Sequence, residues 1–439
     1  MSFPFATPVR YHKCMTKSTT EAVQITTLPN GIRVVTESVP YVQSASVGLW
    51  VGVGSRDEDE PTRGISHFIE HMMFKGTKNR TAHSIADEIE SKGGSLNAFT
   101  DKEATAYQTR VLAEHVGLSM DILTDMMRHS LFDAEEMERE KRVVLEEIKM
   151  YEDSPEDRVH EVFEQTLFPA HPIGKSIIGS SKTVSSITRD DIVGYIENRY
   201  RPDRIVISAA GNLEHDEVVK ITQDMMGDLS GIAPVRKMRT PKASGKSKQL
   251  RKRDIEQVHF VLGTSGYSKM EKQKYALSIL NNVLGGNMSS RLFQEIREKR
   301  GLAYSIGSYS RSYQDGGMFA VYGGTSPSTY EQVLELTRKE FSSVRELGLT
   351  SDELAKAKTQ VRGAVVLGLE SMNARMNRYG ESLLSYGRII PITEVLALYD
   401  AVDHAAIAEV AAQVLDESKM TLSAIGAFPR SKATDAAAD

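Results

Sequence analysis

Two histidines and a glutamate form the most chemically suggestive cluster in the sequence, His67-Phe68-Ile69-Glu70-His71. In an α-helix, residues four apart share one face, so His67 and His71 can bind the same metal ion while Glu70 reaches over it. A catalytic zinc ion has three nitrogen or oxygen ligands from the protein and keeps one position open for water. The cluster therefore predicts a catalytic zinc site that still needs a third ligand.

An acidic segment further along the chain, residues 135–147, can supply that ligand. Its pattern is that of a long helix on which Glu140 and Glu147 lie two turns apart on one stripe. Glu147 can then bind the metal while Glu140 supports the site from behind. The simpler alternative is a pair of structural histidines, but two adjacent imidazoles in an apolar stretch need a polar partner or a metal. We therefore expect Zn²⁺ as the cofactor.

Length and composition describe an ordinary globular protein. A chain of 439 residues is too long for one hydrophobic core and suggests two or three domains. Hydrophobic residues make up 40% and charged residues 26%, which is typical of soluble proteins. The net charge of -5 gives no reason to expect nucleic acid as a partner, and no apolar run is long enough for a membrane span.

We interpret the two ends of the chain as flexible segments. The N-terminal arm, 1–21, has basic residues and no acid before Glu21, which also fits an organellar transit peptide as an alternative. The single cysteine, Cys14, excludes an internal disulfide and suits a reducing compartment. We expect a disordered tail at 429–439 and a bacterial cytoplasmic location, with the mitochondrial matrix as the alternative.

Hydrophobic patterns predict the elements that position the zinc ligands in a catalytic domain spanning 22–226. Two alternating runs within 23–39 predict a β-hairpin, and residues 45–54 predict a third, central strand. The zinc motif lies in the helix that follows. Further strands are expected at 95–100, 104–111 and 205–211, and helices at 113–129, 134–152, 156–167 and 189–200.

The strand after the zinc helix is a candidate substrate-binding segment. A strand beside a metal site, especially at a sheet edge, can pair with an extended peptide through main-chain hydrogen bonds. On pattern alone, an ordinary position within the sheet explains the segment equally well. Its residues are Ser95, Leu96, Asn97, Ala98, Phe99 and Thr100.

The second half of the chain repeats the order of elements in the first. Residues 227–254 are rich in Lys, Arg, Pro, Ser and Gly, and we interpret them as a basic interdomain linker rather than a nucleic-acid contact. The second domain, 255–428, again predicts a strand, a helix, a strand pair, long helices such as 328–346 and 351–386, and a terminal strand. The fold class is therefore α+β, with two similar, duplicated domains, each a mostly antiparallel β-sheet packed with several α-helices.

The second domain has no counterpart of the zinc motif. It does place Arg297 and Tyr304 at a junction between a helix, 289–299, and a strand, where both side chains can donate hydrogen bonds to a peptide carbonyl or an oxyanion. Taken alone, a surface arginine and a half-buried strand tyrosine would be the simpler explanation.

The motif, the spacing to the distant glutamate and the duplication together resemble the inverted-zinc-motif peptidases, which include pitrilysin, insulin-degrading enzyme and the mitochondrial processing peptidase. The resemblance covers residues 22–428. It implies that His67, His71 and Glu147 are the zinc ligands, that Glu70 is the general base and that Glu140 is a supporting acid.

The same resemblance implies that 95–100 is a substrate-pairing edge strand and that Arg297 and Tyr304 contact the substrate. Two domains in one chain match the processing-peptidase branch, in which two chains close into a chamber. Because the zinc motif and the Arg/Tyr pair lie in one polypeptide, the resemblance implies a homodimer, with a heterodimer with a related subunit as the alternative. The expected function is a zinc-dependent endopeptidase that hydrolyses unfolded peptides or presequences in a closed chamber. The alternatives are a noncatalytic structural core subunit of the same fold and a dedicated presequence-processing peptidase that works with a partner chain.

Overall fold

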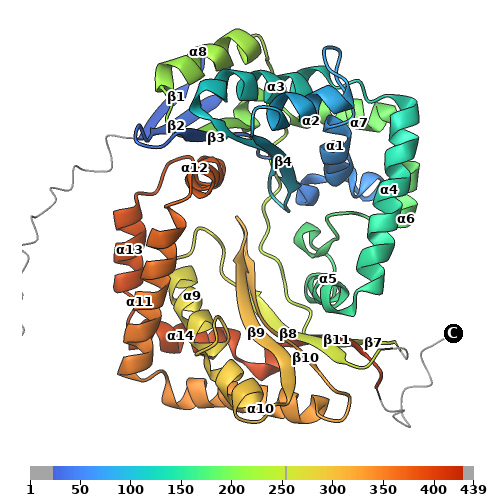
Figure 1. The fold of residues 1–439 in the computed structure, drawn as a ribbon. Helices are drawn as coiled ribbons and strands as arrows, with labels where there is room; N and C mark the ends of the chain where they lie inside the picture. Colours follow the sequence, from blue (N-terminus) through green and yellow to red (C-terminus); the bar gives the residue numbers. More distant parts are fainter. Residues whose placement is uncertain (1–22, 253–254, 429–439) are drawn as a thin grey trace, which may run out of the picture.

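The computed structural model describes residues 23–252 and 255–428. The N-terminal arm with Cys14 and the tail at 429–439 lie outside the described residues, so the expectations for them stay predictions. The predicted α+β class is confirmed, because the described chain forms two separate β-sheets that are each packed with helices (Figure 1).

The first sheet has six strands in the order β1-β2-β6-β3-β5-β4. All neighbours are antiparallel except β2 and β6, which run parallel. Both the hairpin and the central strand predicted from the sequence are present. The strands are β1 Val23–Thr27, β2 Arg33–Ser38, β3 Ser44–Val51, β4 Ser95–Thr100, β5 Thr105–Leu112 and β6 Ile205–Gly211.

Helices of the first half cover one face of this sheet and extend away from it (Figure 1). They carry the two segments in which the sequence predicts metal ligands, α1 and α4. The helices are α1 Ile65–Met73, α2 Ala82–Glu90, α3 Val116–His129, α4 Ala134–Asp153, α5 Pro155–Leu167, α6 Ser181–Ser186, α7 Arg189–Arg199 and α8 His215–Met226.

The second sheet has five strands in the order β7-β11-β8-β10-β9, with only the β7 and β11 pair parallel. Its strands are β7 Lys248–Arg251, β8 Val258–Gly266, β9 Ala303–Ser312, β10 Gly317–Thr325 and β11 Thr421–Gly426. The accompanying helices are α9 Gln273–Leu284, α10 Tyr330–Leu347, α11 Ser351–Gly368, α12 Met372–Tyr386, α13 Ile392–Asp400 and α14 His404–Val414, with a π-helical turn at Phe293–Glu298.

Two sequence-based expectations need correction. The single helix predicted at 351–386 is two helices, because the side chain of Ser371 accepts a hydrogen bond from the Ala374 amide and starts α12 anew. The segment predicted as a linker, 227–254, includes β7, which adds a parallel strand to the second sheet beside β11.

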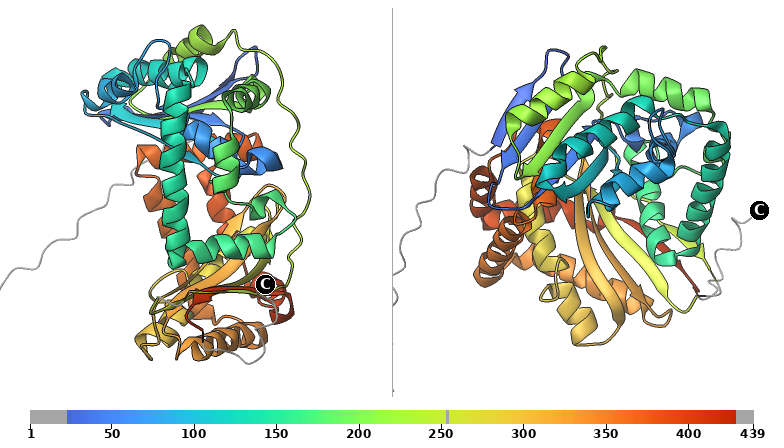
Figure 2. Two further views of the ribbon diagram at one scale, coloured as in Figure 1. Left: turned by 90° about the vertical axis from the view of Figure 1, so that its right-hand side faces the viewer. Right: turned by 45° about the horizontal axis from the view of Figure 1, so that its top comes forward.

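The halves are interlocked, because each contributes a helix to the sheet of the other. From the first half, α5 packs Val162 and Phe163 against Met318 and Ala320 of the second sheet. Figure 2 shows α4 running from the helices of the first half down to α5, which lies against the second sheet.

In return, α12 packs against the first sheet. Its residues Met376 and Leu383 belong to one buried cluster with Trp50 and Val206. The domain limits predicted from the sequence, 22–226 and 255–428, assign each helix to its own half and so leave out this exchange. As domain limits they stay predictions.

Candidate metal centre

The zinc-motif helix α1 begins at a tight backbone contact. Gly64 caps its N-terminus with φ of 94°, and a Cβ at this position would lie 2.7 Å from the carbonyl oxygen of Ile178. Only glycine fits both constraints. The buried carboxylate of Glu58 accepts hydrogen bonds from the amides of Gly64 (2.8 Å) and Ser66 (2.9 Å). These bonds satisfy two amides that a helix N-terminus would otherwise leave unpaired.

The apolar positions of α1 fix which side chains face outward. Phe68 and Ile69 are fully buried in the main core of the first half. His67, Glu70 and His71 lie on the opposite side of these anchors, toward α4 and β4. The helix is thus held by its apolar face while its polar residues stay available for chemistry.

Helix α4 presents the third predicted ligand. Its N-cap residue, Asp133, accepts hydrogen bonds from the first-turn amides. Val144 is buried in the core, and Glu140 is buried on the same side of the helix. Glu147 lies two turns beyond Glu140, partly exposed and directed at the histidines. The predicted stripe of two glutamates therefore corresponds to a helix that packs beside α1.

Three potential ligand atoms converge at this place. Oε2 of Glu147 lies 3.8 Å from Nε2 of His67 and 3.7 Å from Nε2 of His71. Ligand atoms of a tetrahedral zinc ion with bonds of ~2.0–2.1 Å lie about 3.4 Å apart, so the three side chains fit zinc with a small inward movement. Within residues 23–252 and 255–428, no other group of three such side chains comes together.

The remaining ring nitrogen of His71 is held by Glu140. Its Nδ1 lies 2.8 Å from Oε1 of Glu140, whose Oε2 pairs with Nζ of Lys75 at 2.5 Å. Such a bond keeps the proton on Nδ1 and directs the Nε2 lone pair at a metal. Nδ1 of His67 is buried and has no hydrogen-bond partner among the described residues.

Burial and neighbouring charges set the protonation of His67, His71 and Glu140. Burial, reinforced by His71, lowers the pKa of His67 to about 4, so its imidazole is neutral at pH 7 as a metal ligand requires. Burial also lowers the pKa of His71, but the hydrogen bond to Glu140 and the nearby carboxylates outweigh it and raise the pKa. For Glu140, burial is outweighed by the hydrogen bonds from His71 and Lys75, and the pKa is lowered.

Glu70 lies next to the converging ligands and makes a short hydrogen bond to β4. Its Oε2 accepts from the Thr100 hydroxyl at 2.5 Å. Burial raises the pKa of Glu70, and the charge of Glu147 adds to this effect. A carboxylate with a raised pKa is a stronger proton acceptor, which suits a general base.

These residues open into a cavity of about 450 Å³ that is lined by the first half and by Arg311 of the second half. The edge strand β4 forms one wall, through Ala98, Phe99 and Thr100. Helix α5 and the 176–178 loop form further walls. The other lining residues are His67, Glu70, Lys102, Glu147, Tyr151, Asp157, Glu161, Glu164, Ser176, Ile177, Ile178 and Arg311.

Some predicted site residues lie elsewhere. Ser95, Leu96 and Asn97 belong to β4 but do not line the cavity. The guanidinium of Arg297 lies 5.2 Å from the centre of the Tyr304 ring, and Tyr304 is 77% exposed.

Arg311 is the second-half residue that does line the cavity, although the sequence gave no signal for it beyond a cation in a strand. It lies near the end of β9 opposite Tyr304. Since a strand rises about 3.3 Å per residue, the two are about 23 Å apart along β9. Neither Arg297 nor Tyr304 lines the cavity that holds His67 and Glu70.

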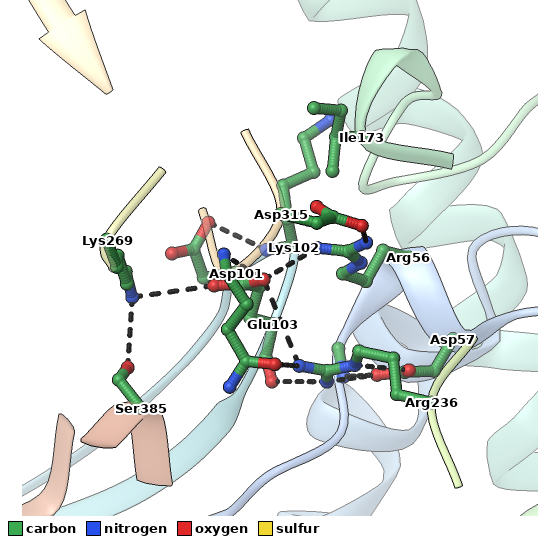
Figure 3. A network of polar contacts seen from close by, with 12 residues as sticks. Arg56, Asp57, Asp101, Lys102, Glu103, Ile173, Arg236, Lys269, Asp315 and Ser385 are labelled. Carbon is green, nitrogen blue, oxygen red and sulfur yellow. Dashed lines mark hydrogen bonds and ion pairs between the residues drawn. The ribbon is translucent and has the colours of Figure 1, made fainter. Parts of the chain in front are cut away.

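A buried ionic network holds the loop that follows β4 (Figure 3). Oε1 of Glu103 accepts hydrogen bonds from Arg56 (2.6 Å) and from the amide of Gln314 (3.0 Å), and Oε2 lies 3.5 Å from Nζ of Lys269. From the linker, Arg236 donates to the carbonyl of Glu103 at 2.8 Å. One loop thus binds the first half, the linker and the second half.

A second ion-pair group lies between the same loop and the cavity. Lys102 pairs with Glu164 of α5 at 3.1 Å, and Glu164 pairs with Arg311 at 2.7 Å. The positions of the cavity walls therefore depend on contacts between the halves.

Comparisons with known proteins bear on the family of the chain. The family model described as "Insulinase (Peptidase family M16)" matches residues 33–181, which contain all three converging ligands. A model described as "Peptidase M16 inactive domain" matches residues 186–361. An uncharacterized zinc protease of Streptomyces coelicolor is 42% identical over 412 residues, covering 92% of this chain and 89% of the relative. The chain belongs to peptidase family M16.

A second relative supports the family assignment of this M16 chain, and a solved structure supports its fold. An uncharacterized zinc protease of Bacillus subtilis is 41% identical and covers 89% of this chain and 95% of its own length. The crystal structure of a protease from Helicobacter pylori matches the fold with a TM-score of 0.84 at 22% identity, covering 93% of this chain and 99% of that one. None of the helices in the described parts of the chain is long and apolar enough to cross a membrane.

Proposed function

We propose that this M16 chain is a zinc-dependent endopeptidase that hydrolyses unfolded peptides or presequences. The observation that supports this most directly is the convergence of His67, His71 and Glu147 beside the carboxylate of Glu70. His67 and His71 would hold the zinc ion through Nε2, and Glu147 through Oε2. A bound zinc ion supplies a Lewis acid that polarises a carbonyl and lowers the pKa of water toward neutrality.

The chain's own residues account for the proton transfers. Glu70 has a raised pKa and lies in the same cavity, so its free oxygen can take a proton from the attacking water. The same carboxyl group can then deliver that proton to the leaving amine. Glu140 keeps the Nδ1 side of His71 occupied, which holds the imidazole in one orientation.

The substrate would bind as an extended strand along β4. This strand is an edge of the first sheet, and three of its residues line the cavity. Main-chain hydrogen bonds to such an edge select for unfolded segments rather than folded proteins. Arg297 and Tyr304 lie outside the cavity of their own chain. We therefore expect them to act in a homodimer, where they would reach the site of the other copy. A heterodimer with a related subunit is the alternative assembly.

The noncatalytic core subunit is the weaker candidate. Without catalysis, nothing would explain why three ligands converge, why Glu140 bonds His71, and why Glu70 lies beside them. The dedicated presequence-processing peptidase differs from the proposal in substrate range, not in chemistry.

The experiment is a comparison of wild type with Glu70→Gln on a quenched-fluorescent peptide library that includes basic amphipathic presequences. The variant should lose hydrolysis by a factor of about 10²–10⁴ while keeping its zinc. Glu90→Gln, exposed at the end of α2, is the matched control and should behave as wild type. A Glu70→Gln variant with near-normal hydrolysis would remove this residue from the role of base.

A further inference from the structure

We propose that Thr100 is a positioning residue that sets the orientation of the Glu70 carboxylate, an inference that rests on the proposed function. The hydroxyl of Thr100 donates to Oε2 of Glu70 at 2.5 Å. In the described parts of the chain this is the only side-chain hydrogen bond that Glu70 makes. It comes from the strand proposed to bind substrate, so one residue joins the base to the peptide-binding edge.

The hydrogen bond distinguishes the two oxygens of the carboxylate. A carboxylate only accepts hydrogen bonds, so the Thr100 proton must point at Oε2. Oε1 is then left for the water that the base has to deprotonate. Without the hydroxyl, Glu70 could rotate about its terminal bond, because such torsions are broad.

The pleat of β4 aims the Thr100 side chain at α1. Alternate residues of a strand share a face, so Thr100 points to the same side as Leu96 and Ala98. Both of those pack against the core that contains α1. Phe99 points to the other side and packs edge to face against the Trp50 ring, with the two ring centroids 5.4 Å apart. A β-branched side chain also has a restricted χ1 angle, which holds the hydroxyl in place.

Backbone contacts fix the position of Thr100 at the end of the strand. It pairs with Thr105 of β5, and the next residue, Asp101, donates its amide to the carbonyl of Ala104 at 2.8 Å. The Asp101 carbonyl accepts from the Ser55 amide at 3.1 Å. The loop that begins there carries Glu103, which binds the linker and the second half. The backbone of Thr100 is therefore held within the first half, next to the loop that contacts the second half.

The first experiment separates orientation from substrate binding. Thr100→Val keeps the shape of the side chain but removes the donor, and kcat should fall about 10–100-fold while KM changes less than about twofold. Thr100→Ser keeps the donor and should retain kcat within about threefold. Thr109→Val is the matched control, since Thr109 is buried on the neighbouring strand β5 and its hydroxyl bonds only the Val47 carbonyl, at 3.5 Å.

The second experiment uses the zinc-free protein, so that its readout does not depend on activity. Thermal unfolding is measured for Thr100→Val, Glu70→Ala and the double variant. Thr100→Val should lower Tm in the wild-type background and have at most half that effect when Glu70 is already removed, because the two side chains share one bond.

Each result has a distinct meaning. Additive Tm losses, or an active enzyme in which Thr100→Val keeps its kcat, would overturn the role of Thr100. So would a raised KM at constant kcat, since that would show a contribution to substrate binding only. A wild-type protein that binds zinc but cleaves no peptide would overturn the proposed function instead, and with it any role for Thr100 in the reaction.

Discussion

Replacing Glu103 by glutamine should destabilise the junction between the halves, because several buried cations face this carboxylate. The substitution keeps the size of the side chain and its ability to accept from the Gln314 amide, but it removes the charge that faces Arg56, Arg236 and Lys269. Breaking a buried ion pair by removing one partner costs about 3–5 kcal/mol, because the other charge stays buried.

The other acids of the network place the expected cost at the lower end of that range. Arg56 retains Asp315 at 2.6 Å, and Arg236 retains Asp57 at 2.5 Å. We therefore expect a loss of about 3 kcal/mol in the free energy of unfolding, which for a unit of 150–250 residues lowers Tm by about 6–12 °C.

Differential scanning calorimetry of Glu103→Gln beside Glu381→Gln measures this directly. Glu381 pairs with the same Lys269 at 3.0 Å, but its side chain is 60% exposed. An exposed pair contributes at most about 1 kcal/mol, so the control should lose no more than about 2–4 °C. Equal Tm values for the two variants would refute the view that the buried carboxylate holds the junction together.

Two further substitutions test the hydrogen bonds that Glu58 and Glu140 make to the zinc-motif helix. Burial raises the pKa of Glu58 to about 7 from an ordinary value near 4.5, so the folded state binds its proton more tightly than the unfolded state does. The stability contributed by this proton is complete below pH 4.5 and is lost as the pH rises toward 7, by about 3 kcal/mol. Glu58→Gln should therefore flatten the fall of Tm over this window, and parallel Tm curves for the two proteins would contradict the assignment. Glu140→Gln should weaken zinc binding about 10–100-fold because His71 loses its charged partner, as zinc titration against a competing chelator would show, and an unchanged affinity would count against that support.

The local sequence was sufficient to predict most elements of the site. Helical spacing placed His67, Glu70 and His71 on one helix, and a second amphipathic pattern placed Glu147 and its neighbour on another. These inferences depend on contacts within single helices. The structure has a helix over the motif, at Ile65–Met73, and has the second helix at nearly the predicted bounds. Alternation also located the edge strand β4 correctly.

Contacts between distant segments could not be read from the sequence in the same way. The basic segment at 227–254 was interpreted as a solvated linker, yet Arg236 is buried against Asp57 and part of the segment forms β7. Its cations resemble any exposed charges until their partners are known. Arg311 likewise gave no signal, because its position at the cavity depends on how the two sheets are packed.

The exchange of helices was missed for a related reason. The apolar faces of α5 and α12 predict burial, but they do not specify which sheet they are buried against. The long pattern at 351–386 also concealed a break, which depends on one capping serine, Ser371.

We expect His67, His71 and Glu147 to hold one zinc ion. Zinc content after exhaustive dialysis, measured by mass spectrometry for wild type, Glu147→Ala and Glu146→Ala, tests it most directly. Glu146 is the neighbouring acid, and its exposed side chain pairs with Lys149. Wild type and Glu146→Ala should retain about one zinc per chain and Glu147→Ala close to none. Zinc that survives the loss of Glu147, or a wild-type protein that binds no zinc, would show that these three side chains are not the zinc ligands.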